Sequence, residues 1–366
     1  MGNPTLAQKQ SKDLFFFQEL FELHLGNISQ NENFHQLSYE KAISDYLCEL
    51  GKLIKETIST RWQGIIFFEH VLLIISIPAE FDDRAKDTMR KCLHNAGLTN
   101  SKESNKVEFT TEPEAAAIYC MRNIKEQNET ILINASFMIV DCGGGTVDLT
   151  TRKLLQNERL SEITERTGDF CGGSYVDREF IKFLSRKLEI CPVLKQYCNE
   201  DIKEKMEDND WIFDINFEDL KSMFDPVIGK IIRLIRGQFD SKEFGRLVPS
   251  IIIPKQPVAA IVRGACDYGL EMSTIVDRTL KYTYGFRTYR NWVDGDPIDR
   301  KKIFEGNNKA KIAIFHCFVT RGTKVGIDKK FSTVRIPIEP DQTEMSFLIY
   351  KTTKSSAEFC DEPDMK

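Results

Sequence analysis

The sequence predicts an α/β protein with a β-rich C-terminal region, and three features of the chain support this. The run "HVLLIISIP", residues 70–78, is continuously apolar and ends at a proline, as expected for a strand buried on both faces of a sheet. From there to about residue 270, strand-like and helix-like runs alternate, which is typical of α/β folds. After about residue 270, β-type runs separated by Gly, Pro and Asp dominate.

The individual elements are predicted from the spacing of apolar residues and from turn residues. Helices are expected over residues 14–25, 39–59, 80–98, 113–124, 172–190, 199–210, 217–238 and the second half of 249–270. Strands are expected over residues 70–78, 106–110, the hairpin 137–151, the start of 249–270, and the runs 280–293, 309–325, 332–340 and 344–353.

Composition limits the classes of function. The 366 residues suffice for two or three domains, and 41% hydrophobic with 29% charged residues is a soluble globular balance. The net charge of −5 gives no general attraction to nucleic acid or to an anionic membrane, so neither is expected as a partner. The ten cysteines include no CxxC pair, and we find no apolar signal segment or bilayer-length run. We therefore expect a reduced, cytoplasmic protein.

A glycine-rich hairpin is the first candidate site. In "FMIVDCGGGTVDLTT", Asp141 and Asp148 stand on either side of Gly143, Gly144, Gly145 and Thr146. Residues opposite each other in an antiparallel pair share a face, so both carboxylates are expected together at the turn end. Glycine N–H groups and the Thr146 hydroxyl can cradle phosphate oxygens, and Mg²⁺ would offset the carboxylates, usually through waters. The alternative is a flexible surface hairpin with two solvated aspartates.

The stretch "FTTEPEAAAIY" supplies a second candidate. Glu112 precedes Pro113, which biases it towards extended geometry, and Pro113 suits the first position of a helix. Glu112 is therefore expected at a strand-to-helix corner, where a carboxylate can position an attacking water. Alternatively, Glu112 and Glu114 are ordinary acidic residues at a helix N-terminus, stabilised by the helix dipole.

The stretch "TGDFCGGSYVDREF" supplies a third. Gly172 and Gly173 lead into a predicted helix, and a helix N-terminus is a natural approach point for an anion. The alternative needs no ligand, because Ser174 and Asp177 have the spacing of a capping box.

These stretches, in this order, resemble the nucleotide-binding domain of the seventy-kilodalton heat-shock chaperone family, within the actin-like ATPase superfamily. The similarity is strongest to the divergent branch numbered twelve in animals. It extends over roughly residues 14–366 and is carried by "IPAEFDDRAKDTMRKCLHNAGL", "TEPEAAAIYC", "IVDCGGGTVDLTT", "GGSYVDREF" and "KQPVAAIVRGACDYGL". The resemblance implies actin-like (ribonuclease-H-like) lobes, ATP or ADP with Mg²⁺, and nucleotide together with unfolded polypeptide or a partner protein as ligands.

The resemblance also implies roles for individual residues. Glu112 matches a glutamate near the attacking water and magnesium, and Pro113 matches the proline that relays nucleotide state between lobes. Asp141 matches a catalytic aspartate that holds magnesium through water, with Asp148 as its partner. The remaining matches are the second phosphate loop (Gly143, Gly144, Gly145 and Thr146), the turn beside the nucleotide (Gly172 and Gly173), and a lysine near the adenosine (Lys203 or Lys205).

The chain also departs from the family pattern. A first phosphate loop of the form D-x-G-T is expected near the N-terminus of such a domain, and no D-x-G-T occurs in this sequence. The L-V-G-G stretch that contacts the adenosine is also missing, and Gly237 and Gly245 stand alone in that region. Since each lost charge stabiliser raises the barrier by about 2.7–4 kcal/mol, we expect impaired hydrolysis.

The resulting expectation is a partial lobe I over residues 1–137, lobe II with the phosphate hairpin over 138–270, and a β-rich, incomplete region over 271–366. The expected function is that of an ATP-binding protein related to the chaperone ATPases. Two alternatives stay open: a non-catalytic protein-binding module, and a partial product of a longer family member.

Overall fold

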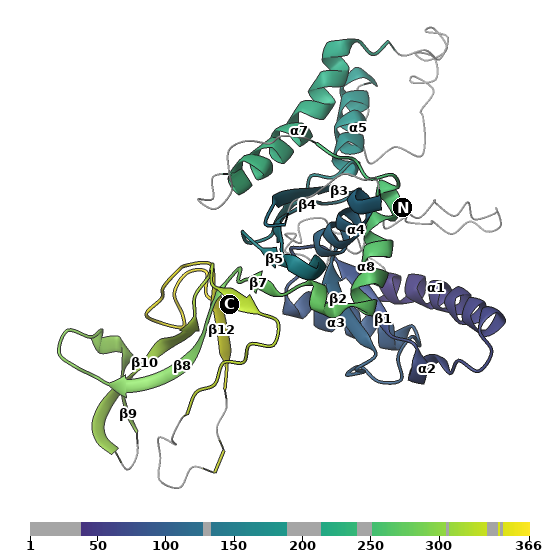
Figure 1. Cartoon of the computed structure of the whole chain (residues 1–366). Helices are drawn as coiled ribbons and strands as arrows, with labels where there is room; N and C mark the ends of the chain where they lie inside the picture. Colours follow the sequence, from purple (N-terminus) through teal and green to yellow (C-terminus); the bar gives the residue numbers. More distant parts are fainter. Residues whose placement is uncertain are drawn as a thin grey trace, which may run out of the picture. The chain divides into compact units, whose positions relative to one another are not determined.

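The structure is a computed structural model that describes residues 38–126, 133–188, 214–239, 251–304, 307–334, 343–344 and 347–366. The chain divides into two compact units (Figure 1). Unit 1 contains residues 1–130, 138–150 and 167–272, and unit 2 contains residues 131–137, 151–166 and 273–366. The helices predicted over 14–25 and 199–210 lie outside the described residues.

The first part of unit 1 contains a strand–helix–strand–helix segment. Strands β1 (Leu73–Ile77) and β2 (Val107–Thr111) pair in parallel over their whole length. Helix α3 (Asp83–Asn95) connects them, and α4 (Glu112–Glu126) follows β2 without an intervening loop. Helices α1 (Tyr39–Arg61) and α2 (Phe67–His70) precede this segment. The predicted α/β arrangement is therefore confirmed here.

The core of this segment lies between the strands and their helices. Leu93 and Leu98, from α3 and the turn after it, are buried against Val107 of β2. Leu47 of α1 packs against the same cluster. Helix α3 begins at an aspartate cap, because the Asp82 carboxylate accepts from the N–H groups of the first turn over 3.1 Å.

Helix α8 (Ala260–Leu270) packs against α4 at backbone distance and follows the short turn η4 (Pro257–Ala259). A Cβ atom built on Gly264 would lie only 1.8 Å from the carbonyl oxygen of Ala115. Any other side chain at position 264 would therefore force the two helices apart. All three alanines of "PEAAAIY" are buried, and Ala115 is the one whose backbone Gly264 approaches this closely.

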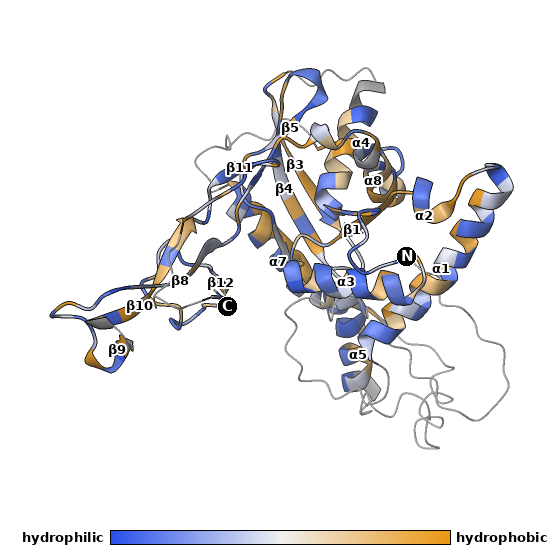
Figure 2. Ribbon diagram, turned by 90° about the horizontal axis from the view of Figure 1, so that it is seen from below, coloured by the Kyte–Doolittle hydropathy of each residue, from blue (hydrophilic) through white to orange (hydrophobic). Residues whose placement is uncertain are grey.

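The second half of unit 1 is built on the glycine hairpin. Strand β4 (Val147–Leu154) pairs with β3 (Ser136–Cys142) and, at Val147–Leu149, with β6 (Thr167–Asp169). Helices α5 (Ser174–Leu188) and α7 (Phe217–Phe239) contact each other beside these strands. Val147, Leu149 and Val227 form their common core. Figure 2 shows the apolar residues along β3 and β4.

Unit 2 is composed mainly of antiparallel strands. One sheet has the order β12–β8–β10–β9, from Ile349–Thr352, Thr283–Asn291, Asn307–Val319 and Lys301–Phe304. Strand β7 (Asp277–Thr279) pairs with β11 (Lys324–Gly326), and β5 (Leu160–Glu162) pairs with the end of β4. No helix among the described residues is long and apolar enough to cross a membrane.

The strand predicted at the start of residues 249–270 is wrong where the structure describes it. Residues 251–254 have no regular structure, and Ile251 and Ile253 are 89% and 76% exposed. An apolar run becomes a strand only where another strand satisfies its backbone hydrogen bonds, and none of the described strands pairs with this segment. The predicted run 332–340 lies largely outside the described residues.

Candidate functional site

The candidate site lies in unit 1, at the edge where β1 and β2 end. The last residues of the parallel pair are Ile77 and Thr111, which are in register. Ala79 and Glu80 follow the first strand, and Glu112 follows the second. The carboxyl ends of parallel strands are a common place for ligands, because loops and helix N-termini converge there. The strand-to-helix corner predicted for Glu112 is therefore present.

The glycine hairpin has the tight turn that its sequence predicts. The N–H of Gly143 donates to the Thr146 carbonyl over 2.9 Å, which leaves Gly144 and Gly145 as the two loop residues. At the base of the hairpin, Leu154 N–H donates to the Ala135 carbonyl over 3.0 Å. Both bonds fit one register, in which Asp141 stands opposite Asp148, and the two carboxylates therefore share a face.

Asp148 is a buried carboxylate, 1% exposed. Its Oδ1 accepts from the N–H of Ala79 over 2.9 Å, so the hairpin is joined to the residue that follows β1. Gly168 on β6 makes room for it, because a Cβ there would lie 2.5 Å from the same oxygen. Burial is the main reason why the pKa of Asp148 is raised to about 6.

Two further carboxylates contribute to the electrostatics at Asp148. The negative charges of Asp141 and Glu80 both raise the pKa of Asp148, while hydrogen bonds from Thr146 and Ala79 oppose the shift. Asp141 is half-buried, and its own pKa is raised by burial. The negative charges of Asp141 and Glu80 thus act on Asp148, and a cation beside these carboxylates would relieve their repulsion.

The front and the back of the glycine turn differ. At the back, the N–H groups of Gly172, Gly173 and Ser174 donate to the carbonyls of Gly145, Gly143 and Gly144 over 3.1, 3.0 and 2.9 Å. At the front, Gly144 is exposed and a Cβ built on it would meet nothing within 4 Å. No hydrogen bond from the N–H of Gly144 or Gly145 is seen in the described part of the chain. The turn is thus held from behind, with its front open to a ligand.

The N-terminus of α5 has a different role from the one its sequence predicts. The amides of Gly172, Gly173 and Ser174 hold the glycine turn, so they do not offer their N–H groups to an anion. A Cβ on Gly172 would lie 2.6 Å from the carbonyl oxygens of Gly143 and Gly144, which explains why glycine stands there. The capping-box alternative is also wrong, because the Ser174 hydroxyl is buried without a hydrogen-bond partner among the described residues. A place beside the nucleotide for these glycines stays a prediction.

Glu112 and Glu114, at the start of α4, have different surroundings. Glu114 is fully buried and forms a capping box with Thr111: its Oε2 accepts from Thr111 N–H over 3.3 Å, and Thr111 Oγ1 accepts from Glu114 N–H over 3.4 Å. Glu112 is the first helical residue and only half-buried. Pro113 occupies the second helical position rather than the predicted first. Of the two, only Glu112 lies towards solvent.

Sequence reasoning missed Glu80 and Gly168. Glu80 has the same local signal as Glu112, since both follow a buried strand at a proline-containing corner: "SIPAE" and "TTEP". Gly168 gave no signal, because its role depends on β6 lying beside Asp148. Lys203 and its alternative Lys205 lie outside the described residues. No group of three or more His, Cys, Asp or Glu side chains placed to hold a metal directly occurs in the described ranges.

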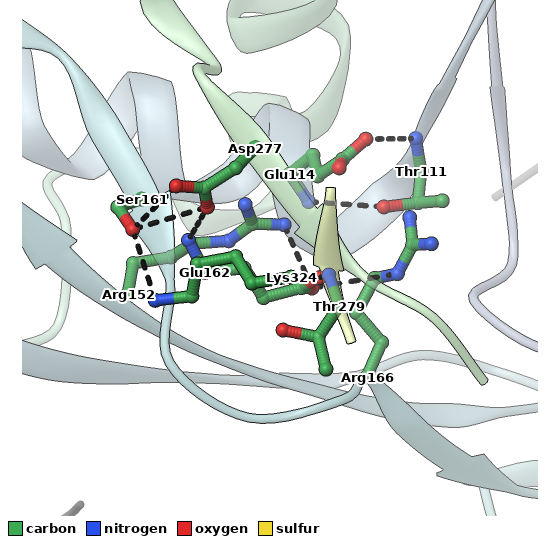
Figure 3. A network of polar contacts seen from close by, with 9 residues as sticks. All are labelled: Thr111, Glu114, Arg152, Ser161, Glu162, Arg166, Asp277, Thr279 and Lys324. Carbon is green, nitrogen blue, oxygen red and sulfur yellow. Dashed lines mark hydrogen bonds and ion pairs between the residues drawn. The ribbon is translucent and has the colours of Figure 1, made fainter. Parts of the chain in front are cut away.

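A second polar cluster lies in unit 2 (Figure 3). The buried Glu162 carboxylate receives Arg152 Nη2 at 3.2 Å and the Thr279 N–H at 2.5 Å. The Asp277 carboxylate accepts from the Ser161 hydroxyl at 2.9 Å and from the Glu162 N–H at 2.8 Å. These contacts join β5 to β7, and we interpret the cluster as structural because its acceptors are satisfied by neighbouring backbone and side chains.

Comparison with known proteins shows which proteins this chain is similar to. No protein-family model matches it. Heat shock 70 kDa protein 12A of Homo sapiens is 22% identical over 420 residues, which covers 80% of this chain and 62% of that protein. Heat shock 70 kDa protein 12B of Homo sapiens is 26% identical over 163 residues, covering 31% and 24%. The Chaperone protein HscA homolog of Acinetobacter baumannii (strain AYE) is 26% identical over 183 residues, covering 50% and 27%.

This chain is similar to proteins of the heat-shock 70 kDa family, at low identity. It spans 62% of the length of the human 12A protein, so it matches only part of that relative. The alignment extends over 420 positions, more than the 366 residues of the chain itself. The 12A protein therefore has segments within the aligned span that have no counterpart here.

Proposed function

We propose that this chain binds ATP or ADP with Mg²⁺ at the front of the glycine turn. The arrangement that carries this proposal is the opposed pair Asp141 and Asp148 at the end of a turn whose carbonyls are held by α5. The carbonyls of the turn are held by the residues at the start of α5, and the N–H group of the exposed Gly144 is open to phosphate oxygens. The similarity to heat-shock 70 kDa proteins supports the same ligand.

Magnesium would act between phosphate and carboxylates. Asp141 and Asp148 would hold it through waters, and Glu80 would add negative charge to the same region. The Mg²⁺ ion would supply charge neutralisation for the phosphates, which the carboxylates of Asp141 and Asp148 alone would repel. Glu112, at the adjacent strand-to-helix corner, would orient a water near the terminal phosphate.

We further propose that hydrolysis by this chain is very weak. A phosphoryl group is normally stabilised from several sides during transfer, and the sequence contains no D-x-G-T loop to oppose the glycine turn. Binding without turnover would leave the chain as a non-catalytic protein-binding module. The other alternative is that the chain is a partial product of a longer protein and has no activity of its own.

Calorimetric titration with Mg-ATP and Mg-ADP tests the binding. Asp141→Asn should weaken binding at least about tenfold, because one charge facing the metal is lost. Asp177→Asn is the matched control, since Asp177 is an exposed aspartate in the first turn of α5. Absence of binding at millimolar nucleotide, or equal effects of the two substitutions, would refute the proposal.

A single-turnover assay tests the hydrolysis separately. We expect little or no phosphate release by the full chain, and no further change in Glu112→Gln. Release at the rate of an ordinary chaperone ATPase that is abolished by Glu112→Gln would show that the chain is a competent enzyme.

A further inference from the structure

Helix α7 has two apolar faces, and the described residues cover only one of them. The first face packs on the hairpin core, where Met223 and Val227 are buried and Ile231 and Leu234 are partly buried. Helix α5 also contacts α7, and Figure 1 shows the two helices side by side. This face explains why α7 packs on the hairpin core. It does not explain the apolar residues on the second face of the helix.

The second face is a stripe of five large apolar side chains exposed to solvent. Phe217 is 73% exposed, Leu220 47%, Phe224 42%, Ile228 44% and Ile232 41%. Their spacing of three or four residues keeps them on one side of the helix, along about 22 Å of its length. A stripe this long and this apolar is typical of an interaction site, because leaving it in water costs free energy that association would recover.

The charges along α7 indicate what covers the stripe. Acidic residues Glu218, Asp219 and Asp225 lie in the N-terminal half, and Lys230, Arg233 and Arg236 lie in the C-terminal half, with Lys221 the exception. A surface that is acidic at one end and basic at the other is complementary to a reversed copy of itself. Antiparallel packing also places opposite ends of the two helix dipoles together.

We propose that the exposed face of α7 is an interface between two copies of this chain, with their α7 helices antiparallel about a two-fold axis beside Ile228. In this register Ile228 faces its own symmetry mate, and Phe224 of one copy faces Ile232 of the other. Glu218 lies within about two residues, or about 3 Å along the helix, of Arg236 on the opposite copy. Apolar residues thus meet along the centre and opposite charges meet at the ends.

The interface is small. Five partly exposed side chains on each copy bury less than the roughly 800 Å² per partner of a standard interface. The dimer is therefore weak and concentration-dependent, and the end charges make it weaker at high salt.

Sedimentation velocity of the full chain over a range of about 1–100 μM tests the interface, at low and high salt. We expect a reversible monomer–dimer equilibrium. Ile228→Glu should weaken the dimer by at least about tenfold, because two carboxylates would face each other on the axis. Val262→Glu is the matched control: Val262 is a 62% exposed apolar residue on α8, away from the stripe, and its substitution should have no effect.

A charge swap tests the antiparallel register. Glu218→Arg and Arg236→Glu should each weaken the dimer several-fold, and the double variant should restore it, which a merely structural role of either residue would not produce. Circular dichroism should show an unchanged helix content in every variant. A chain that is monomeric at all concentrations would mean that another part of the chain or a different protein covers α7, and this would overturn the proposal. Dimerisation that is insensitive to Ile228→Glu, or a swap that fails to restore it, would also overturn it.

Discussion

The carboxylate of Asp148 accepts a hydrogen bond from the backbone N–H of Ala79 over 2.9 Å. The two residues are 69 positions apart in the sequence, and this bond joins the glycine turn to the end of β1. Asp148 therefore has two roles in our interpretation: it holds the hairpin in place, and it provides charge for a cation.

Asp148→Asn should make the ligand-free protein more stable at pH 7. The folded state raises the pKa of Asp148 to about 6, against about 3.9 for an unperturbed aspartate. Between these values the folded state keeps the proton and the unfolded state releases it, so the free energy of unfolding falls as pH rises through this window. Asparagine keeps the acceptor for Ala79 without the buried charge, and we expect a gain of about 1–3 kcal/mol at pH 7.

Urea denaturation between pH 4 and pH 7 checks this prediction. The wild type should lose stability from about pH 4 to pH 6 relative to Asp148→Asn, in which this contribution to the slope is absent. Asp177→Asn, at an exposed position, should follow the wild type. An Asp148→Asn variant that is less stable than the wild type at pH 7 would contradict the assignment of a buried, poorly compensated charge.

Gly172→Ala should displace the glycine turn. The new Cβ would lie 2.6 Å from backbone atoms of Gly143 and Gly144, which are not the ends of flexible side chains and cannot move aside. Overpacking of this kind costs about 1–3 kcal/mol, and nucleotide affinity should fall with it. Gly173→Ala is the control, because a Cβ there meets nothing within 4 Å. Equal melting temperatures for the two variants would show that α5 does not hold the turn as described.

Gly264→Ala should be among the most damaging glycine substitutions in unit 1. Its Cβ would lie 1.8 Å from the Ala115 carbonyl oxygen, so α4 and α8 would have to separate. We expect at least about 3 kcal/mol of destabilisation, measured by chemical denaturation. Gly237→Ala, in α7 with nothing within 4 Å of the new Cβ, should instead be neutral or stabilising by up to about 1 kcal/mol. A tolerated Gly264→Ala would contradict the close approach of the two helices.

Glu162→Gln should destabilise unit 2. Glu162 and Arg152 are both fully buried and 3.2 Å apart, so removing one charge leaves the other in a site without solvent. Breaking such a pair typically costs about 3–5 kcal/mol. Hydrogen exchange should show faster opening of β5 and β7, whereas Glu103→Gln, at an exposed acidic position of unit 1, should leave exchange unchanged. Unaltered exchange in Glu162→Gln would show that this ion pair contributes little.

Local patterns sufficed to predict several elements. The apolar run before Pro78 predicts β1, because a continuous apolar run ending at proline suits a strand buried on both faces. The helical spacing of apolar residues in 217–238 predicts α7 almost to its ends. The two-residue glycine loop and the opposition of Asp141 and Asp148 follow from the same kind of local rule, since a tight turn sets the register of its hairpin.

Other features could not be predicted from neighbouring residues. The segment at 251–254 has the composition of a strand but no described strand to pair with. The amides of Gly172 and Gly173 have the sequence of an anion site, but they donate to the glycine turn instead. In both cases the outcome depends on what lies opposite the backbone, which local sequence does not specify.

The sequence by itself determined the α/β alternation, the hairpin register and the resemblance to the heat-shock 70 kDa proteins, because these depend on periodicity, turn chemistry and motif order. Only the tertiary structure decided that Asp148 is buried against Ala79, that Glu80 shares its surroundings, and that one face of α7 is uncovered. These properties depend on distances between residues far apart in the chain. Burial and charge proximity, which set the pKa of Asp148 and expose the stripe on α7, therefore exist only in the folded protein.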